Sequence, residues 1–487
     1  MDTATREITE YRLFINGEWS TAEDGELFED RNPATGELYA RVHFGGPGDM
    51  QRAIAAADAA RVAWGATLAS QREAVLLKAA NLLEGRIPEI ADVLIDEAGS
   101  TFGKAMFESG FVVNLLRSAA GECRRIFGET LPADSPGLLS LSIRRPLGVI
   151  GGIAPFNFPF LLAMKKVALA LAAGNTFVLK PAEETAVVGL KIAEILHAAG
   201  LPPGVLNVVP GRGEVVGPAL VDDPRVRMIT FTGSTAVGRE LAVKAARNLK
   251  KITLEMGGKS PLIILDDADL DYAVAAACFG IFLHQGQVCM ANSKVIVGAA
   301  LFEPFCERFV AKVGTLQVGD PRDPHTVIGP LIRTDQCAYI DGHVSDAVAK
   351  GARLLCGGTS EGAFYQPTVL AGVTPEMRVF HEESFGPVVS LIAAADHHEA
   401  LRLANDSAYG LSSAVITNDL QKALELALGL EAGMVHVNGS TCYDEPHAPF
   451  GGIKESGMGR EGGRWSMEEM TELKWVTIQM GQRQFPF

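Results

Sequence analysis

Residues 147–159 read LGVIGGIAPFNFP, an apolar run that ends in a proline-flanked turn. A short apolar run bounded by glycine and proline is typical of a buried strand. Further runs of this kind follow, separated by stretches with helical periodicity. The predicted strands are Leu147–Ile153, Thr176–Leu179, Val205–Val209, Met228–Phe231 and Ile252–Leu254, and the helices include Thr185–Ala199 and Thr235–Asn248. This alternation predicts an α/β fold with a parallel sheet covered by helices on both faces.

A second alternating block follows toward the C-terminus. Its predicted strands are Leu262–Leu265, Val295–Val297, Val388–Leu391 and Met434–Val437, with a helix through Ala275 and another over Glu303–Val313. Upstream of both blocks, Met50–Trp64 and Gln71–Ile95 carry apolar residues at helical spacing. The sequence therefore predicts two parallel-sheet units in tandem behind a helical N-terminal third.

Two further segments fit neither sheet. Leu138–Arg144 and Leu473–Met480 alternate apolar and polar residues, as half-exposed strands do. Strands without a place in a sheet tend to find a partner edge. We expect these two to pair with each other or with another subunit.

Composition excludes several classes of protein. The 487 residues are 47% hydrophobic and carry a net charge of −15, which argues against disorder and against nucleic-acid binding. There is no leader-like segment and no apolar run near about 18 residues, so we expect a soluble, cytoplasmic protein without membrane contact. The seven cysteines and ten histidines form none of the usual motifs. We expect neither disulfides nor a metal site.

Polar residues follow several of the predicted strands, where ligands bind in parallel sheets. Asn157 lies in the turn after the first strand, Lys180 and Glu183 follow the second, and Gly233-Ser234 open the helix after the fourth. Each has an ordinary alternative, as a helix cap or a solvated loop. Together they indicate a nucleotide, with a pyrophosphate at the helix N-terminus.

Two residues could take part in covalent catalysis, one as the nucleophile and one as the base. Glu255 ends the fifth strand and is followed by Gly257 and Gly258, which permit a close approach of another segment. Cys289 lies in a loop of small residues before the next strand. Most free cysteines are inert, but a nucleophile needs a base and an oxyanion donor. Glu255 and Asn157 are candidates for these two roles.

These motifs, in this order, resemble the aldehyde dehydrogenase superfamily over essentially the whole chain. Further matching stretches are Glu382–Pro387, Asn405–Leu411 with its Tyr409-Gly410 pair, and Pro449–Lys454 continuing to Gly459-Arg460. The resemblance implies two Rossmann-like domains and a small oligomerisation sheet. The implied parts are an NAD-binding domain (1–122 and 147–256), a catalytic domain (257–455) and oligomerisation segments (123–146 and 456–487), assembled as a homodimer or homotetramer.

The resemblance also implies roles for individual residues. Cys289 resembles the nucleophile, Asn157 with the Cys289 backbone N–H the oxyanion hole, and Glu255 the general base. The cofactor is expected to be NAD, with NADP possible, because a carboxylate at Glu183 can bind the ribose hydroxyls and repels a 2′-phosphate. The residues that match the cofactor site are Pro155, Phe156, Lys180, Glu183, Gly233, Ser234, Glu383 and Phe385.

The implied reaction is NAD(P)-dependent oxidation of an aldehyde through a thiohemiacetal and a thioester. Members that transfer the acyl group to coenzyme A lack a glutamate at the place of Glu255, so its presence favours hydrolysis to a free carboxylate. The C-terminal region around Asp444–Phe450 and Met467–Ile478, together with Lys165, resembles the benzaldehyde, vanillin and salicylaldehyde dehydrogenase branch. An apolar pocket for an aromatic ring is expected from Phe158, Leu162, Val288, Tyr443 and Phe450.

Other functions remain open at this stage. A broad-range aliphatic aldehyde dehydrogenase is the nearest alternative, and the lack of an arginine beside the Cys289 loop weakens a semialdehyde substrate. A cysteine hydrolase would need a histidine, for which His284 is the candidate. A non-catalytic descendant of the family would be expected to have lost Cys289 or Glu255.

Overall fold

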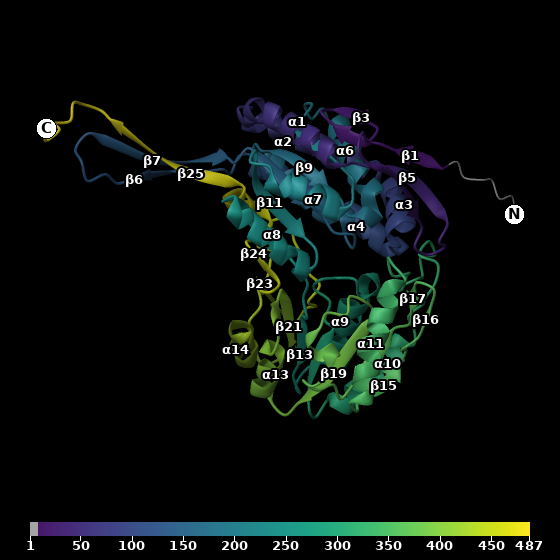
Figure 1. Cartoon of the computed structure of the whole chain (residues 1–487). Coiled ribbons are helices and arrows are strands. Elements are labelled where there is room, and N and C mark those ends of the chain that lie inside the picture. Colours follow the sequence, from purple (N-terminus) through teal and green to yellow (C-terminus); the bar gives the residue numbers. More distant parts are fainter. Residues whose placement is uncertain (1–7) are drawn as a thin grey trace.

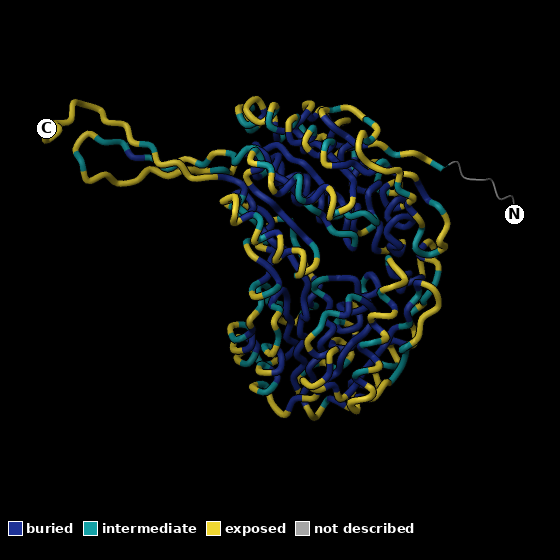
Figure 2. Tube along the Cα trace, viewed as in Figure 1, coloured by how far each residue is buried: buried dark blue, intermediate teal, exposed yellow. Residues whose placement is uncertain are grey.

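The computed structural model describes residues 8–487. It has two α/β bodies, one above the other, and a long antiparallel arm that leaves the first body (Figure 1). Buried residues fill both bodies, whereas the arm is mostly exposed or half-buried (Figure 2). Within the described residues, no helix combines the length and apolar character needed to cross a bilayer. The predicted α/β fold with two parallel-sheet units is confirmed.

The first sheet has eight strands in the order β24-β12-β11-β8-β9-β10-β2-β3. Its five central strands are parallel and correspond to the five predicted ones: β8 (Val149–Ile153), β9 (Thr176–Lys180), β10 (Leu206–Val208), β11 (Val226–Thr232) and β12 (Lys251–Glu255). Four helices connect them: α5 (Pro159–Ala172), α6 (Ala186–Ala198), α7 (Gly213–Asp222) and α8 (Thr235–Arg247). The chain runs outward from β8 in both directions, so the loop after β8 lies at a switch point, where ligands bind.

The N-terminal prediction missed a set of short strands. β2 (Leu13–Ile15) and β3 (Glu18–Ser20) extend the first sheet as an antiparallel hairpin. Its turn is Asn16-Gly17, with φ of 54° and 80°. An Asn-Gly pair favours this conformation, so the turn was the available signal. Three other strands, β1 (Thr9–Tyr11), β4 (Glu26–Arg31) and β5 (Leu38–Phe44), form a separate small sheet.

The N-terminal helices also differ from the prediction at one point. Met50–Trp64 lies within α1 (Pro47–Gly65), as expected, but Gln71–Ile95 is divided into α2 (Ala69–Glu84) and α3 (Ile87–Ala98). Pro88 lies in the first turn of α3, where its missing N–H costs nothing. In the middle of one long helix the same proline would break a hydrogen bond.

The second sheet has seven strands in the order β15-β18-β19-β14-β13-β21-β22. All of them are parallel except the edge strand β15 (Arg353–Cys356). The others are β13 (Pro261–Ile264), β14 (Lys294–Gly298), β18 (Thr368–Ala371), β19 (Val388–Ala394), β21 (Ser412–Ile416) and β22 (Met434–Val437). Helices α9 (Leu270–Phe282), α10 (Phe302–Val313) and α11 (Asp335–Ala349) belong to this body. The Cys289 loop lies between α9 and β14 and faces the first body.

The arm consists of β6 (Glu129–Leu131), β7 (Leu138–Pro146) and β25 (Thr471–Gln479). β7 and β25 pair antiparallel from Thr471 opposite Pro146 to Gln479 opposite Leu138. The two predicted strands that fitted neither sheet therefore pair with each other. The remainder of the segment 456–487 begins inside the first body. There β24 (Gly457–Met458) pairs with β12, and α15 (Gly463–Glu469) packs on α4 (Phe102–Glu122) and α5. The extended part of that segment therefore starts at Thr471.

Candidate active site

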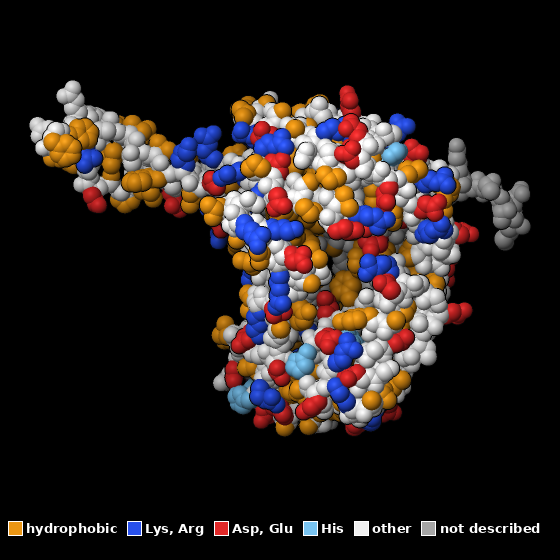
Figure 3. Space-filling model, in the orientation of Figure 1, with side chains coloured by type: hydrophobic (Ala, Val, Ile, Leu, Met, Phe, Trp, Pro, Cys, Tyr) orange, Lys and Arg blue, Asp and Glu red, His pale blue; other side chains and the backbone are white. Residues whose placement is uncertain are grey.

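Two cavities meet between the bodies. A larger cavity of about 490 Å³ and a smaller one of about 320 Å³ have only Asn157 and Cys289 in common among their lining residues. The space-filling view shows the hollow between the bodies, with acidic and basic side chains around it (Figure 3). The predicted oxyanion donor and the predicted nucleophile thus lie where the two cavities join.

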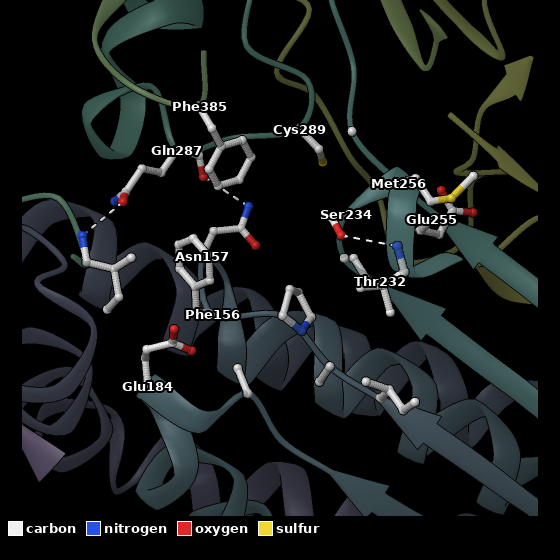
Figure 4. Close-up of a pocket in the computed structure, with 18 of the residues that line it drawn as sticks. Phe156, Asn157, Glu184, Thr232, Ser234, Glu255, Met256, Gln287, Cys289 and Phe385 are labelled. Carbon is white, nitrogen blue, oxygen red and sulfur yellow. Dashed lines mark hydrogen bonds between the residues drawn. The ribbon is translucent and has the colours of Figure 1, made fainter. Parts of the chain in front are cut away.

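Asn157 is held at this junction from both sides. It is buried in the turn between β8 and α5, and its Nδ2 donates to the carbonyl of Gln287 at 3.0 Å (Figure 4). Its own backbone carbonyl accepts from Lys104 Nζ at 2.8 Å. The amide therefore lies against the Cys289 loop, two residues before the thiol.

The Cys289 side chain faces the same space as the Asn157 amide (Figure 4). Burial raises the pKa of the Cys289 thiol, and the nearby carboxylates of Glu383 and Glu255 raise it further. The thiol is therefore protonated near neutral pH in this state. A thiolate nucleophile requires a group that accepts its proton.

Glu255 ends β12 and is buried on the larger cavity. Within residues 8–487, neither of its carboxylate oxygens has a hydrogen-bond partner. Burial raises the pKa of Glu255 well above its usual value, Glu461 raises it further, and Lys166 and Lys165 oppose the shift. A desolvated carboxyl group without partners is suited to bind and activate a water molecule.

The two glycines after Glu255 explain how the bodies come so close. A Cβ on Gly257 would lie 2.2 Å from Glu383 Oε2, and one on Gly258 would lie 2.4 Å from the carbonyl oxygen of Cys289. A side chain at Gly257 would displace the Glu383 carboxylate, and one at Gly258 would push the backbone of the Cys289 loop away. The glycines permit the close approach that the sequence predicted, and the approaching groups are the Cys289 loop and Glu383.

All eight predicted cofactor residues line the larger cavity. At one end, Lys180 is buried, which lowers the pKa of its ammonium, and Glu183 opposes that shift. Glu183 Oε1 accepts from the backbone N–H of Gly213 at 2.8 Å, which fixes its carboxylate. A carboxylate fixed in this way could accept hydrogen bonds from ribose hydroxyls.

At the other end, Glu383 and Phe385 approach the loop after β8. Glu383 Oε1 accepts from Gly258 N–H at 3.1 Å, and burial raises the pKa of Glu383 to about 7. The Phe385 ring meets Phe156 edge-on at 5.8 Å, and Phe385 has a φ of 47°, which is uncommon for a residue with a side chain. Pro155 precedes this ring pair in the same wall. Strained backbone of this kind is often found at ligand sites.

The middle of the larger cavity suits a pyrophosphate. Gly233 and Ser234 precede α8, and Ser234 Oγ accepts from Val237 N–H at 3.4 Å (Figure 4). The N-terminus of this 13-residue helix therefore opens on the cavity. A ribose site, a helix N-terminus and a second carboxylate in one cavity of this size fit a dinucleotide.

The smaller cavity differs in character. All five predicted substrate residues, Phe158, Leu162, Val288, Tyr443 and Phe450, line it. Further aromatic residues that the sequence interpretation did not include are Phe107, Phe111 and Phe279. Phe107 and Phe111 are four residues apart on α4, so a helical stripe of aromatics was the available signal. The walls are mainly apolar and lead to Cys289.

Lys165 lies behind this cavity and is fully buried. Its ammonium contacts Asp444 at 2.9 and 3.0 Å and lies 4.5 Å from the centre of the Phe450 ring. The charge of Lys165 is therefore matched by Asp444.

His284 does not join the site. It lines neither cavity that contains Cys289, and its ring meets Phe158 edge-on at 5.7 Å. Burial and the neighbouring Lys104 lower the pKa of His284 well below its usual value. The pairing that a cysteine hydrolase needs is not formed in this structure.

The sequence interpretation missed charged residues that the fold brings to the site. Arg333 crosses from the second body to Glu184 at 2.9 Å on the larger cavity. Lys104 and Glu108 on α4 contact the turn that carries Asn157. None of these residues belongs to a motif, and only the tertiary structure reveals them.

Comparison with known proteins agrees with this geometry. The family model described as "Aldehyde dehydrogenase family" matches residues 19–476. The chain belongs to the aldehyde dehydrogenase family. Members are NAD(P)-dependent, and related structures include both NAD-dependent and NADP-dependent enzymes, so the chain is an NAD(P)-dependent aldehyde dehydrogenase.

Several relatives are similar over nearly their whole length. A vanillin dehydrogenase of Pseudomonas fluorescens is 45% identical, over 97% of this chain and 99% of that protein. A benzaldehyde dehydrogenase of Bacillus subtilis is 42% identical, over 98% of each chain. The structure of a salicylaldehyde dehydrogenase from Pseudomonas putida G7, complexed with salicylaldehyde, has a TM-score of 0.96 and 40% identity, over 99% of this chain and all of that one.

Proposed function

We propose that this aldehyde dehydrogenase oxidises aromatic aldehydes to free carboxylates, with Cys289 as the nucleophile. The observation that carries the proposal is the junction of the two cavities at Asn157 and Cys289. An aldehyde held in the apolar cavity would present its carbonyl carbon to Cys289, while a dinucleotide in the larger cavity would lie on the other side of the same thiol.

The first half of the reaction acylates the enzyme. Cys289 Sγ first loses its proton to solvent water, and the thiolate then attacks the aldehyde carbon, so that the carbonyl oxygen becomes an oxyanion. Asn157 Nδ2 and the Cys289 backbone N–H donate to that oxyanion, with the amide turning from the Gln287 carbonyl toward the substrate. The bound nicotinamide supplies a hydride acceptor. Loss of hydride from the thiohemiacetal leaves a thioester on Cys289.

The second half releases the product. Glu255 accepts a proton from a water molecule, which attacks the thioester carbon and expels the Cys289 thiolate. The partnerless carboxylate of Glu255 supports this role, since no protein group competes with the water within the described residues. The expected product is a free carboxylate.

The apolar cavity supports an aromatic substrate. Flat rings pack well edge-on or offset against aromatic walls, and six aromatic side chains line this cavity: Phe107, Phe111, Phe158, Phe279, Tyr443 and Phe450. Relatives of this chain are named vanillin, benzaldehyde and salicylaldehyde dehydrogenase, and all three of these aldehydes are aromatic.

A semialdehyde with a second carboxylate is disfavoured. Among the described residues, the one cation lining the apolar cavity is Lys104, and its ammonium already donates to Glu108, Ser100 and Asn157. A second carboxylate on the substrate would therefore find no free cation in this cavity to pair with. A broad-range aliphatic activity remains the second candidate, because the walls are mainly apolar.

We further propose a preference for NAD over NADP. The carboxylate of Glu183 is fixed by Gly213 and can accept from both ribose hydroxyls. The 2′-phosphate of NADP would bring negative charge against the same carboxylate, and Lys180 would offset part of the repulsion.

We also propose that the arm joins two copies of the chain. The outer edge of β25 has no partner strand within the described residues. Leu473, Trp475 and Ile478 are exposed on β25, and hydrophobic side chains are spread along the arm among polar ones in Figure 3. A long apolar edge of this kind favours pairing with a second copy. Truncation after Thr471 should give monomers or aggregates by light scattering, and an unchanged oligomer would contradict this part.

The function is tested with a panel of aldehydes and both cofactors. Absorbance of the reduced nicotinamide gives kcat/KM for benzaldehyde, hydroxylated benzaldehydes, unbranched aliphatic aldehydes and a carboxylated semialdehyde. We expect the benzaldehydes with NAD to give the highest values. Equal or higher values for aliphatic aldehydes would favour the broad-range alternative, and no reduction with any aldehyde would contradict the proposed reaction.

A further inference from the structure

A buried ion pair lies beside the turn that carries Asn157. Lys104 and Glu108 are one helical turn apart on α4, and their side chains are 1% and 0% exposed. Lys104 Nζ and Glu108 Oε2 are 2.5 Å apart. Removing two charges from water costs several kcal/mol per ion unless further hydrogen bonds compensate, so such a pair needs a structural or functional reason.

The ammonium of Lys104 donates in three directions. Its partners are Glu108, Ser100 Oγ at 2.9 Å and the backbone carbonyl of Asn157 at 2.8 Å. An ammonium has three donors, so all of them are used. Lys104 also lies 4.4 Å from the centre of the Phe158 ring, the next residue along the turn.

Glu108 holds the other side of the same turn. Its Oε1 accepts from the backbone N–H of Phe160 at 2.9 Å and of Leu161 at 3.0 Å. These are free donors in the first turn of α5, where a carboxylate is favoured by the helix dipole. Lys104 and Glu108 therefore hydrogen-bond to the backbone of Asn157, Phe160 and Leu161.

We propose that Lys104 and Glu108 are positioning residues for the oxyanion donor. The proposal rests on the proposed role of Asn157. The pair fixes the backbone from which the Asn157 amide projects, so the amide has to turn only about its own side-chain bonds, away from the Gln287 carbonyl, to reach the developing oxyanion. Preorganised donors are effective because they cost no reorganisation during the reaction, and a displacement of about 1 Å can cost on the order of 100-fold in rate.

The test is a double-mutant cycle with Asn157→Ala, read as the rate of the first NADH burst at saturating aldehyde and NAD. Asn157→Ala alone should slow the burst by about 10²–10³-fold. Lys104→Met, which keeps the length of the side chain, should slow it by roughly ten- to a hundredfold. If Lys104 acts through Asn157, adding Lys104→Met to Asn157→Ala should change the rate by less than about threefold.

A matched control is Lys294→Met. Lys294 is also a buried lysine whose ammonium donates to backbone carbonyls, those of Leu403 and Asp406, but these lie in the second body away from Asn157. This variant should lower the melting temperature and leave the burst rate within about twofold of the wild type. It separates a loss of stability from a loss of positioning.

A second variant covers the case in which Lys104→Met does not fold because Glu108 is left charged and buried. In Lys104→Met/Glu108→Gln both charges are gone, and the carbonyl oxygen of the substituted amide can still accept from the backbone of α5. This double variant should fold and show the slow burst. A wild-type burst rate in a folded variant, or the same loss with and without Asn157, would overturn the inference. A wild-type burst in Asn157→Ala would instead overturn the role of Asn157 in the proposed function.

Discussion

The two cavities that meet at Cys289 are lined by different kinds of side chain. The larger one is lined by charged groups from both bodies, including Lys180, Glu183, Arg333 and Glu383. The smaller one is lined mostly by aromatic and aliphatic side chains, and the cations near it, Lys104 and Lys165, are paired with the carboxylates of Glu108 and Asp444.

This difference separates two tasks. We propose that the charged, fixed groups recognise the polar dinucleotide, whereas the apolar walls accept an aromatic ring and exclude water from the oxyanion. The junction needs features of both, because the oxyanion requires a dry, preorganised donor and the thioester requires a water molecule. Glu255 stands on the side of the larger cavity, which places the proposed base where water can enter.

The largest effect is expected at the junction itself. Cys289→Ala removes the nucleophile that both cavities serve and should lower kcat by on the order of 10⁶-fold, as in other enzymes that lose a covalent nucleophile. NAD binding, measured by calorimetry, should persist, since the residues proposed to hold the dinucleotide are unchanged. As the control, Cys306→Ala changes a buried cysteine of α10 and should leave kcat almost unchanged. Turnover that survives Cys289→Ala would contradict the shared junction.

The second-largest effect on activity is expected from lowering the pH, which protonates groups at the junction. The pKa values of Cys289 and Glu255 are both raised by burial, and both groups act in their deprotonated forms. Activity should therefore fall as the pH drops below these raised values, by about tenfold per pH unit for each group that limits the rate. Burst and steady-state rates measured across pH separate the two groups. A rate that increases toward acid would contradict both assignments.

A substitution in the larger cavity should change only cofactor choice. Glu183→Ser removes the carboxylate that repels a 2′-phosphate and should narrow the NAD to NADP ratio in kcat/KM by roughly ten- to a hundredfold, mainly by improving NADP. The relative rates for different aldehydes should stay as they are. If the wild type prefers NADP, or if the ratio does not move, Glu183 does not bind the ribose.

Substitutions in the smaller cavity should have the smallest effect and the opposite selectivity. Phe158→Leu or Phe450→Leu removes one aromatic wall and should lower kcat/KM for benzaldehyde relative to hexanal by about 2- to 10-fold, the range expected for one aromatic contact. The cofactor ratio should not change. A shift in cofactor preference from these variants would show that the two cavities are not independent.

The sequence allowed much of this to be predicted, for reasons that particular elements make clear. Strands β8 to β12 are apolar runs between turn residues, so the local sequence alone was enough to predict them. The hairpin at Leu13–Ser20 was missed because its strands are only three residues long, although Asn16-Gly17 marked the turn. The proposed catalytic residues Cys289, Glu255 and Asn157 could be predicted only because motifs far apart in the chain resemble one family.

Other parts depend on contacts that no local pattern reveals. Lys104 and Glu108 have the spacing of an ordinary exposed ion pair on a helix, and nothing in the sequence indicates that they are buried against a turn some fifty residues away. Arg333 and Glu184 likewise meet only because the two bodies face each other. Such residues are found from the structure.

The central claim is that the acyl group is carried on Cys289 at the junction and released by water that Glu255 activates. The most direct measurement mixes Glu255→Gln with benzaldehyde and NAD, follows NADH, and determines the mass of the quenched protein. We predict about one equivalent of NADH in a burst, then a stall with turnover slowed by on the order of 10²–10⁴-fold. A benzoyl adduct should lie on the peptide that contains Cys289. No burst, or a burst without an acyl adduct on Cys289, would contradict the account.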